Sequence, residues 1–170
     1  MSPVRYIIVM GVSGCGKSTV AALLAQQLGW AFVEGDALHP PANVEKMSQG
    51  IPLTDADRLP WLHEIAQTLR NWRAAGQPGV VACSALRRQY REIIAGQAVD
   101  VRFTYLQGDF QLIKQRLAMR QGHYMPVSLL ESQFSALEAP APDEPVITLD
   151  VEAEAEGLVA DIIQMLDLKA

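Results

Sequence analysis

Apolar runs and amphipathic stretches alternate along the whole chain. The apolar runs are short and rich in Val, Ile and aromatic residues, which is typical of buried parallel strands. They cover residues 4–10, 30–35, 80–83, 101–106 and 146–149. Between them, apolar residues recur three and four positions apart, which predicts helices with one buried face. These helices cover residues 17–28, 61–75, 86–95, 110–120, 129–137 and 156–168, with a shorter helical turn at 42–48 and a loop at 50–60.

This alternation predicts an α/β fold, in which one parallel sheet carries helices on both faces within a single domain of residues 1–170. Right-handed crossovers then place the carboxyl ends of all strands at one edge of the sheet. We expect the functional site at this edge. Segments that are far apart in the sequence meet there, namely residues 11–18, Asp36, 83–84, Gly108 and the region of Asp150.

The stretch at 11–18 reads G-V-S-G-C-G-K-S and fits the phosphate-loop pattern G-x-x-x-x-G-K-[ST] between a strand and a helix. In such a loop, backbone N–H groups and the positive end of the helix point at phosphate oxygens. Lys17 supplies a positive charge for the β and γ phosphates, and the Ser18 hydroxyl is a ligand for Mg²⁺. A glycine-rich turn without a ligand is the alternative, and the flanking strand and helix argue against it. We therefore predict that a nucleoside triphosphate is bound by Gly11, Val12, Ser13, Gly14, Cys15, Gly16, Lys17, Ser18 and Thr19.

Composition narrows the class of protein further. A chain of 170 residues with 49% hydrophobic and 19% charged residues is ordinary for a globular domain. Its net charge of −5 leaves no basic surplus for a nucleic-acid backbone. No apolar run approaches the ~20 residues that span a bilayer, the N-terminal stretch lacks a signal-peptide layout, and the two cysteines do not form a disulfide framework. We expect a cytoplasmic enzyme with neither a nucleic acid nor a membrane as partner.

Asp36 is the first candidate for chemistry beyond the phosphate loop. At the tip of the second strand it could accept the proton of an acceptor hydroxyl or bind a water in the Mg²⁺ shell, and the alternative is a turn-forming aspartate. His39 and Lys46 follow it, where an acceptor molecule would lie. Ser84 comes directly after the third strand and faces the same cleft. These residues, and His123 further along the chain, are candidates for contact with the acceptor.

Arg58 has two interpretations that the sequence leaves open. It lies in the predicted loop before a helix, and Asp55 and Asp57 are close enough in sequence to pair with it at the surface. Alternatively, its guanidinium is free to bind an anionic acceptor, because arginine matches a carboxylate with two parallel hydrogen bonds.

A basic segment near residues 110–137 is a candidate lid. Arg116 and Arg120 are four residues apart and share one helix face. A glycine break containing His123 and a second helix follow, which is how a mobile cover over the phosphates can be built. The alternative is an exposed basic helix. His39 and His123 lack zinc-type spacing, so we propose no metal beyond Mg²⁺.

The chain resembles the gluconate kinases (gluconokinases), small P-loop kinases related to shikimate and adenylate kinases. The resemblance covers about residues 5–165 and rests on segments in the family's order: G-V-S-G-C-G-K-S (11–18), G-D-A-L-H-P (35–40), N-V-E-K-M (43–47), G-I-P-L-T-D-A-D-R-L-P-W-L (50–62), C-S-A-L (83–86), G-H-Y-M (122–125) and L-L-E-S-Q-F (129–134). It implies a three-layer α/β/α fold of the P-loop NTPase class, with a five-stranded parallel sheet in adenylate-kinase-like order and a helical lid.

The resemblance also implies an activity, the transfer of phosphate from ATP, with Mg²⁺, to the 6-hydroxyl of D-gluconate by a homodimer. Carried over by position, Asp36 becomes the base or a residue of the metal shell, Arg58 a gluconate contact and Arg120 the lid arginine on the phosphates. The chain departs from the family pattern at Cys15, where serine or threonine is usual. It departs again at Arg87, where lysine is expected, which puts a substrate role for that position in question.

Two classes of alternative are open. A kinase for another small acceptor, such as shikimate, shares the loop and the aspartate after the second strand, but it would carry a glycine-rich turn where this chain has residues 83–85. A nucleotide-binding switch without catalysis would bind the triphosphate, but it leaves Asp36, Arg58 and Arg120 unexplained.

Overall fold

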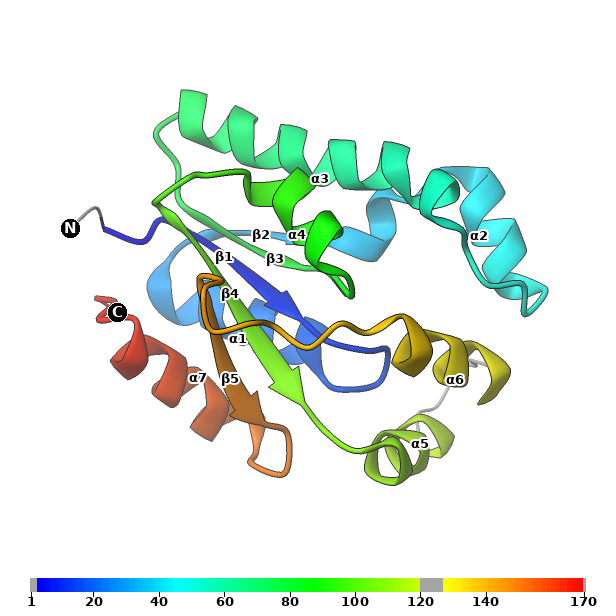
Figure 1. Cartoon of the computed structure of the whole chain (residues 1–170). Helices are drawn as coiled ribbons and strands as arrows, with labels where there is room; N and C mark the ends of the chain where they lie inside the picture. The colour runs from blue at the N-terminus through cyan, green and yellow to red at the C-terminus, as the bar shows by residue number, and fades with distance from the viewer. Residues whose placement is uncertain (1–2, 120–126, 170) are drawn as a thin grey trace.

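The computed structural model describes residues 3–119 and 127–169, and it contains one parallel sheet of five strands (Figure 1). The order across the sheet is β2-β3-β1-β4-β5, which confirms the expected adenylate-kinase-like topology. The strands are β1 (Tyr6–Met10), β2 (Ala31–Glu34), β3 (Gly79–Ala82), β4 (Val101–Gln107) and β5 (Val146–Asp150). At the centre, Ile8 of β1 is opposite Val81 on one side and Phe103 on the other.

Helices cover both faces of the sheet and complete the three layers. In Figure 1, α1 (Lys17–Leu28) and α7 (Ala155–Met165) lie together on one face, and α3 (Asp55–Ala74) and α4 (Arg88–Ala95) lie together on the other. The remaining elements lie beyond the carboxyl ends of the strands: the short 3₁₀ helix η1 (Gly35–Leu38) and the helices α2 (Pro41–Ser48), α5 (Phe110–Ala118) and α6 (Val127–Ala136). This end of the sheet holds the candidate site.

The sequence pattern explains why the sheet forms the core. All five residues of β1 are buried, as expected for a central strand that is covered on both faces. On α3, Trp61, Ile65 and Leu69 recur at helical spacing and pack into the same core. None of the helices in the described ranges combines the length and the apolar character needed to cross a bilayer.

The prediction of a loop at residues 50–60 was wrong over its second half. Helix α3 begins at Asp55 because Thr54 and Asp57 form a capping box. The Asp57 N–H donates to the Thr54 hydroxyl at 3.1 Å, and the Thr54 N–H donates to the Asp57 carboxylate at 2.9 Å. The cap supports a helical start that continues through Pro60, the last residue of the segment predicted as a loop. Arg58 therefore lies on the first turns of a rigid helix and not on a loop.

Candidate functional site

The phosphate loop lies between β1 and α1, as predicted. Gly14 and Gly16 have positive φ angles of 84° and 94°, conformations that favour glycine and let consecutive N–H groups line one concave surface. Lys17 is the first residue of α1 and is only 6% exposed. Val12 and Cys15 point into the core, and the Gly11 N–H donates to the Ser84 carbonyl at 3.2 Å. A cavity over this loop is lined by Ser13, Gly14, Gly16, Lys17, Ser18, Thr19, Asp36 and Arg116.

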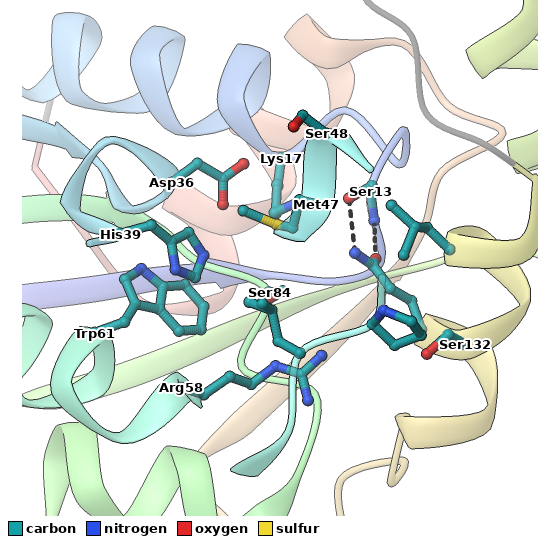
Figure 2. A pocket seen from close by; sticks show the side chains of 14 residues that line it. Ser13, Lys17, Asp36, His39, Met47, Ser48, Arg58, Trp61, Ser84 and Ser132 are labelled. Carbon is teal, nitrogen blue, oxygen red and sulfur yellow. Dashed lines mark hydrogen bonds between the residues drawn. The ribbon is translucent and has the colours of Figure 1, made fainter. Parts of the chain in front are cut away.

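A second cavity adjoins the first and faces α2, α3 and α6 (Figure 2). We call the first one the phosphate cavity and the second one the acceptor cavity. The acceptor cavity is lined by Ser13, Lys17, Asp36, His39, Met47, Ser48, Pro52, Leu53, Arg58, Trp61, Ser84, Leu129, Ser132 and Gln133. Ser13, Lys17 and Asp36 line both cavities, so they mark the boundary at which a group can pass from one to the other.

Asp36 reaches this boundary because η1 follows β2 directly. The turn is fixed by a hydrogen bond from the His39 N–H to the Asp36 carbonyl at 3.3 Å. Trp61 closes the turn from the side of α3, because its indole Nε1–H donates to the Gly35 carbonyl at 2.8 Å. The Asp36 carboxylate thus stands on a short, held segment, where it faces both the phosphate loop and the acceptor cavity (Figure 2).

His39 forms part of the wall of the acceptor cavity. Its ring stacks on Trp61 with 4.1 Å between the ring centroids. Its Nδ1 lies 3.2 Å from the side-chain nitrogen of Asn43. Burial lowers the pKa of His39 below its ordinary value, against an opposing effect of the Asp36 charge. The imidazole is therefore neutral near pH 7. In this form it can donate a hydrogen bond to a hydroxyl group or accept one from it.

Lys46 does not line the acceptor cavity, although sequence analysis offered it as a substrate contact. Its ammonium lies 2.9 Å from the carboxylate of Asp57, and the neighbouring residues Met47 and Ser48 face the cavity instead. The reason is that Asp57 is fixed by the capping box at the start of α3, so its charge attracts the nearest cation. The Thr54 amide and the Lys46 ammonium lower the pKa of Asp57 to about 2.

Arg58 lines the acceptor cavity and has no carboxylate partner in the described part of the chain. Both acids that sequence analysis offered as its partners are bound elsewhere: Asp57 pairs with Lys46, and Asp55 pairs with Arg87 at 3.4 Å. Arg58 instead donates from Nη1 to the hydroxyl oxygen of Tyr90 at 2.9 Å. The guanidinium charge is therefore available to an anionic ligand.

The two cysteines take no part in the site chemistry. Burial raises the pKa of the Cys83 thiol to about 12 and raises that of Cys15 as well. Both thiols are free and buried, and therefore protonated near pH 7. The next residue after Cys83, Ser84, lines the acceptor cavity as predicted.

Gln133 on α6 contacts the phosphate loop, and sequence analysis did not predict it as a site residue. Its side-chain oxygen accepts a hydrogen bond from the Ser13 N–H at 2.6 Å, and its side-chain nitrogen donates to the Ser13 hydroxyl at 3.0 Å (Figure 2). These two bonds join α6 to the phosphate loop at the boundary between the cavities. The helix reads V-S-L-L-E-S-Q-F-S-A, an ordinary amphipathic pattern, and nothing in the sequence indicated which residue Gln133 contacts.

The candidate lid is described only in part. Arg116 on α5 lines the phosphate cavity and donates from Nη2 to the Val151 carbonyl at 2.6 Å, which holds its guanidinium beside the cavity. The other two predicted lid residues, Arg120 and His123, lie outside the described residues.

The phosphate cavity offers oxygen ligands that fit Mg²⁺. Ser18 and Asp36 both line it, and Mg²⁺ is usually bound through one or two protein oxygens together with phosphates and water. Within residues 3–119 and 127–169, no group of three or more His, Cys, Asp or Glu side chains is arranged to hold a metal by itself. The donor set thus suits a metal that is shared with a bound nucleotide.

Comparison with known proteins identifies the family of this chain. The family model described as an AAA domain matches residues 7–140. A gluconokinase of Gluconobacter oxydans is 51% identical over 160 residues, which are 94% of this chain and 90% of the relative. A sugar kinase structure from Janibacter sp. superposes with a TM-score of 0.92 at 44% identity, covering 98% of this chain and 96% of the other.

A gluconokinase structure from Sinorhizobium meliloti has a TM-score of 0.87 at 42% identity, and the match covers 98% of this chain and 94% of the other. These relatives match nearly the whole chain at 42–51% identity. The chain belongs to the gluconokinase family of P-loop kinases.

Proposed function

We propose that this protein is a gluconokinase, which transfers the γ-phosphoryl group of ATP to the 6-hydroxyl of D-gluconate and forms 6-phospho-D-gluconate and ADP. One observation carries the proposal: a phosphate cavity and an acceptor cavity share Ser13, Lys17 and Asp36, and the acceptor cavity holds an arginine that has no acidic partner among residues 3–119 and 127–169. Phosphoryl transfer needs a donor and an acceptor held in line across such a boundary.

Each end of the acceptor has a chemically matched group. The carboxylate of gluconate binds Arg58, because a guanidinium and a carboxylate form strong paired hydrogen bonds. The 6-hydroxyl then lies toward Asp36, which accepts its proton or holds a water of the metal shell. His39 and Ser84 line the cavity between these ends and can bond the remaining hydroxyl groups.

On the donor side, Lys17 and the loop N–H groups bind the phosphates and stabilise the charge that develops on them during transfer. Ser18, with Asp36, would hold Mg²⁺, which supplies further neutralisation of the phosphate charge when it is bound. Arg116 adds a positive charge beside the phosphate cavity. That Arg120 also binds the phosphates stays a prediction.

A kinase acting on another acceptor is the second candidate, and the relatives that match nearly the whole chain do not favour it. A switch without catalysis is also disfavoured, because nucleotide binding alone gives no reason for an acceptor cavity whose arginine has no acidic partner within the described ranges. A homodimer in the cytoplasm completes the proposal on the strength of the family resemblance, and light scattering after size exclusion tests the assembly.

The test is ADP release from Mg-ATP measured side by side with D-gluconate, shikimate, AMP and no acceptor. We expect strong turnover with gluconate alone. Turnover with shikimate or AMP would assign another acceptor, and equal slow hydrolysis in every reaction would mean that the protein is not a gluconokinase.

A further inference from the structure

Tyr90 on α4 is the residue that holds Arg58 at the acceptor cavity. The side chain of Tyr90 is large, and the residue is only 2% exposed, so its hydroxyl has a fixed position. That hydroxyl accepts a hydrogen bond from Arg58 Nη1 at 2.9 Å, and the guanidinium carbon lies 5.5 Å from the centre of the Tyr90 ring. Two contacts from one buried side chain thus fix the orientation of the Arg58 guanidinium.

The direction of the hydrogen bonds around Tyr90 is also fixed. A phenol has one proton, and Tyr90 donates it to the carboxylate of Asp55. The hydroxyl oxygen is then left with lone pairs, which suit Arg58 as a donor. The second oxygen of Asp55 accepts from the Gln89 amide at 3.1 Å and from Arg87 at 3.4 Å. Asp55 is therefore satisfied by three neighbours, and Arg58 is not one of them.

Asp55 and Arg58 would otherwise be natural partners. They are three residues apart on α3, and residues at this spacing are neighbours on a helix surface. A carboxylate is a stronger acceptor for a guanidinium than a phenol oxygen is, because both groups carry a charge. If Arg58 paired with Asp55, the carboxylate of a substrate would have to compete with the Asp55 carboxylate for the Arg58 guanidinium.

We propose that Tyr90 is a positioning residue for acceptor recognition: its hydroxyl stands between Asp55 and Arg58, orients the Arg58 guanidinium toward the acceptor cavity and keeps its charge free for the substrate carboxylate. This inference rests on the proposed function, because it takes an acid as the acceptor. It also gives Asp55 a task, since that carboxylate holds the Tyr90 proton on the side away from Arg58.

The test compares gluconate KM, ATP KM and kcat for the wild type, Tyr90→Phe, Asp55→Asn and the double variant. In Tyr90→Phe, Asp55 and Arg58 are free to pair, so gluconate KM rises about tenfold while kcat and ATP KM stay within about twofold. Adding Asp55→Asn removes the competing charge and returns gluconate KM to within about threefold of the wild type. Tyr105→Phe is the matched control, because Tyr105 is also a buried tyrosine but lines neither cavity, and it leaves all three parameters unchanged.

A gluconate KM that does not change in Tyr90→Phe, or that Asp55→Asn does not restore, overturns the inference. An equal rise in ATP KM also overturns it, since that result indicates a structural role. If Tyr90→Phe does not fold, the exposed Asp55 gives a second comparison: Asp55→Glu reaches past the phenol to Arg58 and raises gluconate KM, whereas Asp55→Asn does not. Equal KM values for these two variants overturn the inference, while a wild type inactive with gluconate overturns the proposed function itself.

Discussion

A buried guanidinium, Arg91, ties α4 to the segment between α6 and β5, and its removal gives a stability test. Arg91 is 3% exposed. It donates to both oxygens of Glu144, at 2.7 and 3.2 Å, to the Ala85 carbonyl at 2.8 Å and to the Glu138 carbonyl at 3.0 Å. Ala85 follows Ser84 and has a φ of 45°, an uncommon conformation for a residue with a side chain. Arg91 therefore supports the loop that forms one wall of the acceptor cavity.

Arg91→Met removes all four hydrogen bonds and leaves the Glu144 side chain, 7% exposed, without its counter-ion. Loss of one partner of a buried ion pair costs about 3–5 kcal/mol. For a chain of this length we expect the midpoint of thermal unfolding to fall by roughly 10 °C. Arg88→Met is the matched control on the same helix. Arg88 pairs with Asp143, but its side chain is 45% exposed and the pair is screened by solvent, so we expect a much smaller fall in the unfolding midpoint than for Arg91→Met.

The pH dependence separates this mechanism from a simple loss of packing. Burial by itself raises the pKa of Glu144, but the hydrogen bonds from Arg91 and from the Ala141 N–H outweigh it and lower the pKa below the ordinary 4.5. In the wild type this acid therefore stabilises the fold above pH 4.5, and the contribution is lost as the pH falls through the lowered value. In Arg91→Met the hydrogen bond and the charge of Arg91 are lost, and the bond from the Ala141 N–H is left to oppose burial. The pKa of Glu144 therefore rises, and the ionised carboxylate is less stable in the folded protein at neutral pH.

The difference in unfolding midpoint between wild type and Arg91→Met should consequently be larger near pH 7.5 than near pH 5. Circular dichroism melts at both pH values measure it. Replacing both partners, as in Arg91→Met with Glu144→Met, should recover most of the stability at neutral pH. A midpoint difference below about 3 °C, or one that is equal at both pH values, would refute the reasoning.

Four further substitutions test the site. Asp36→Asn should lower kcat by about 10²–10⁴ with ATP affinity nearly intact, and a loss under tenfold removes the role as base. Arg58→Ala should raise gluconate KM by about 10–100-fold, whereas an equal rise in ATP KM indicates a folding defect. Gln133→Ala removes both bonds to Ser13, so kcat should fall about tenfold. The rate of ATP hydrolysis without acceptor should rise relative to the rate of phosphoryl transfer, and an unchanged ratio of these two rates contradicts the prediction. Arg120→Ala should mainly reduce kcat, and an unchanged kcat makes it a surface residue.

The sheet and the phosphate loop were predictable from the sequence because their signals are local. A run such as 6–10 has no polar residue to place outside, so it forms a central strand. The glycines at 14 and 16 stand where the loop needs positive φ, and Lys17 opens α1 as the motif requires. The strand order was implied by the family resemblance, and right-handed crossovers placed the loops that carry Asp36 and Ser84 at one edge of the sheet.

Contacts between side chains of distant segments were not predictable in this way. Gln133 bonds Ser13 across 120 positions, and its own helix segment reads as ordinary amphipathic sequence. The start of α3 was missed for a different reason. Residues 50–60 were predicted as a loop, but the reciprocal bonds of Thr54 and Asp57 support the first helical turn before Pro60 is reached.

The availability of Arg58 shows most clearly why charge proximity in sequence is a poor guide to pairing. Two acids within three residues of Arg58 suggest that it is neutralised, yet each acid is saturated by other donors. Asp57 accepts a hydrogen bond from the Thr54 N–H in the helix cap and pairs with Lys46. Asp55 accepts a hydrogen bond from the Tyr90 hydroxyl on the neighbouring helix α4. The same capping box that starts α3 therefore removes one competitor for Arg58. Helix initiation and the availability of Arg58 are thus linked in this segment, because the acids nearest to it in sequence are bound by other donors.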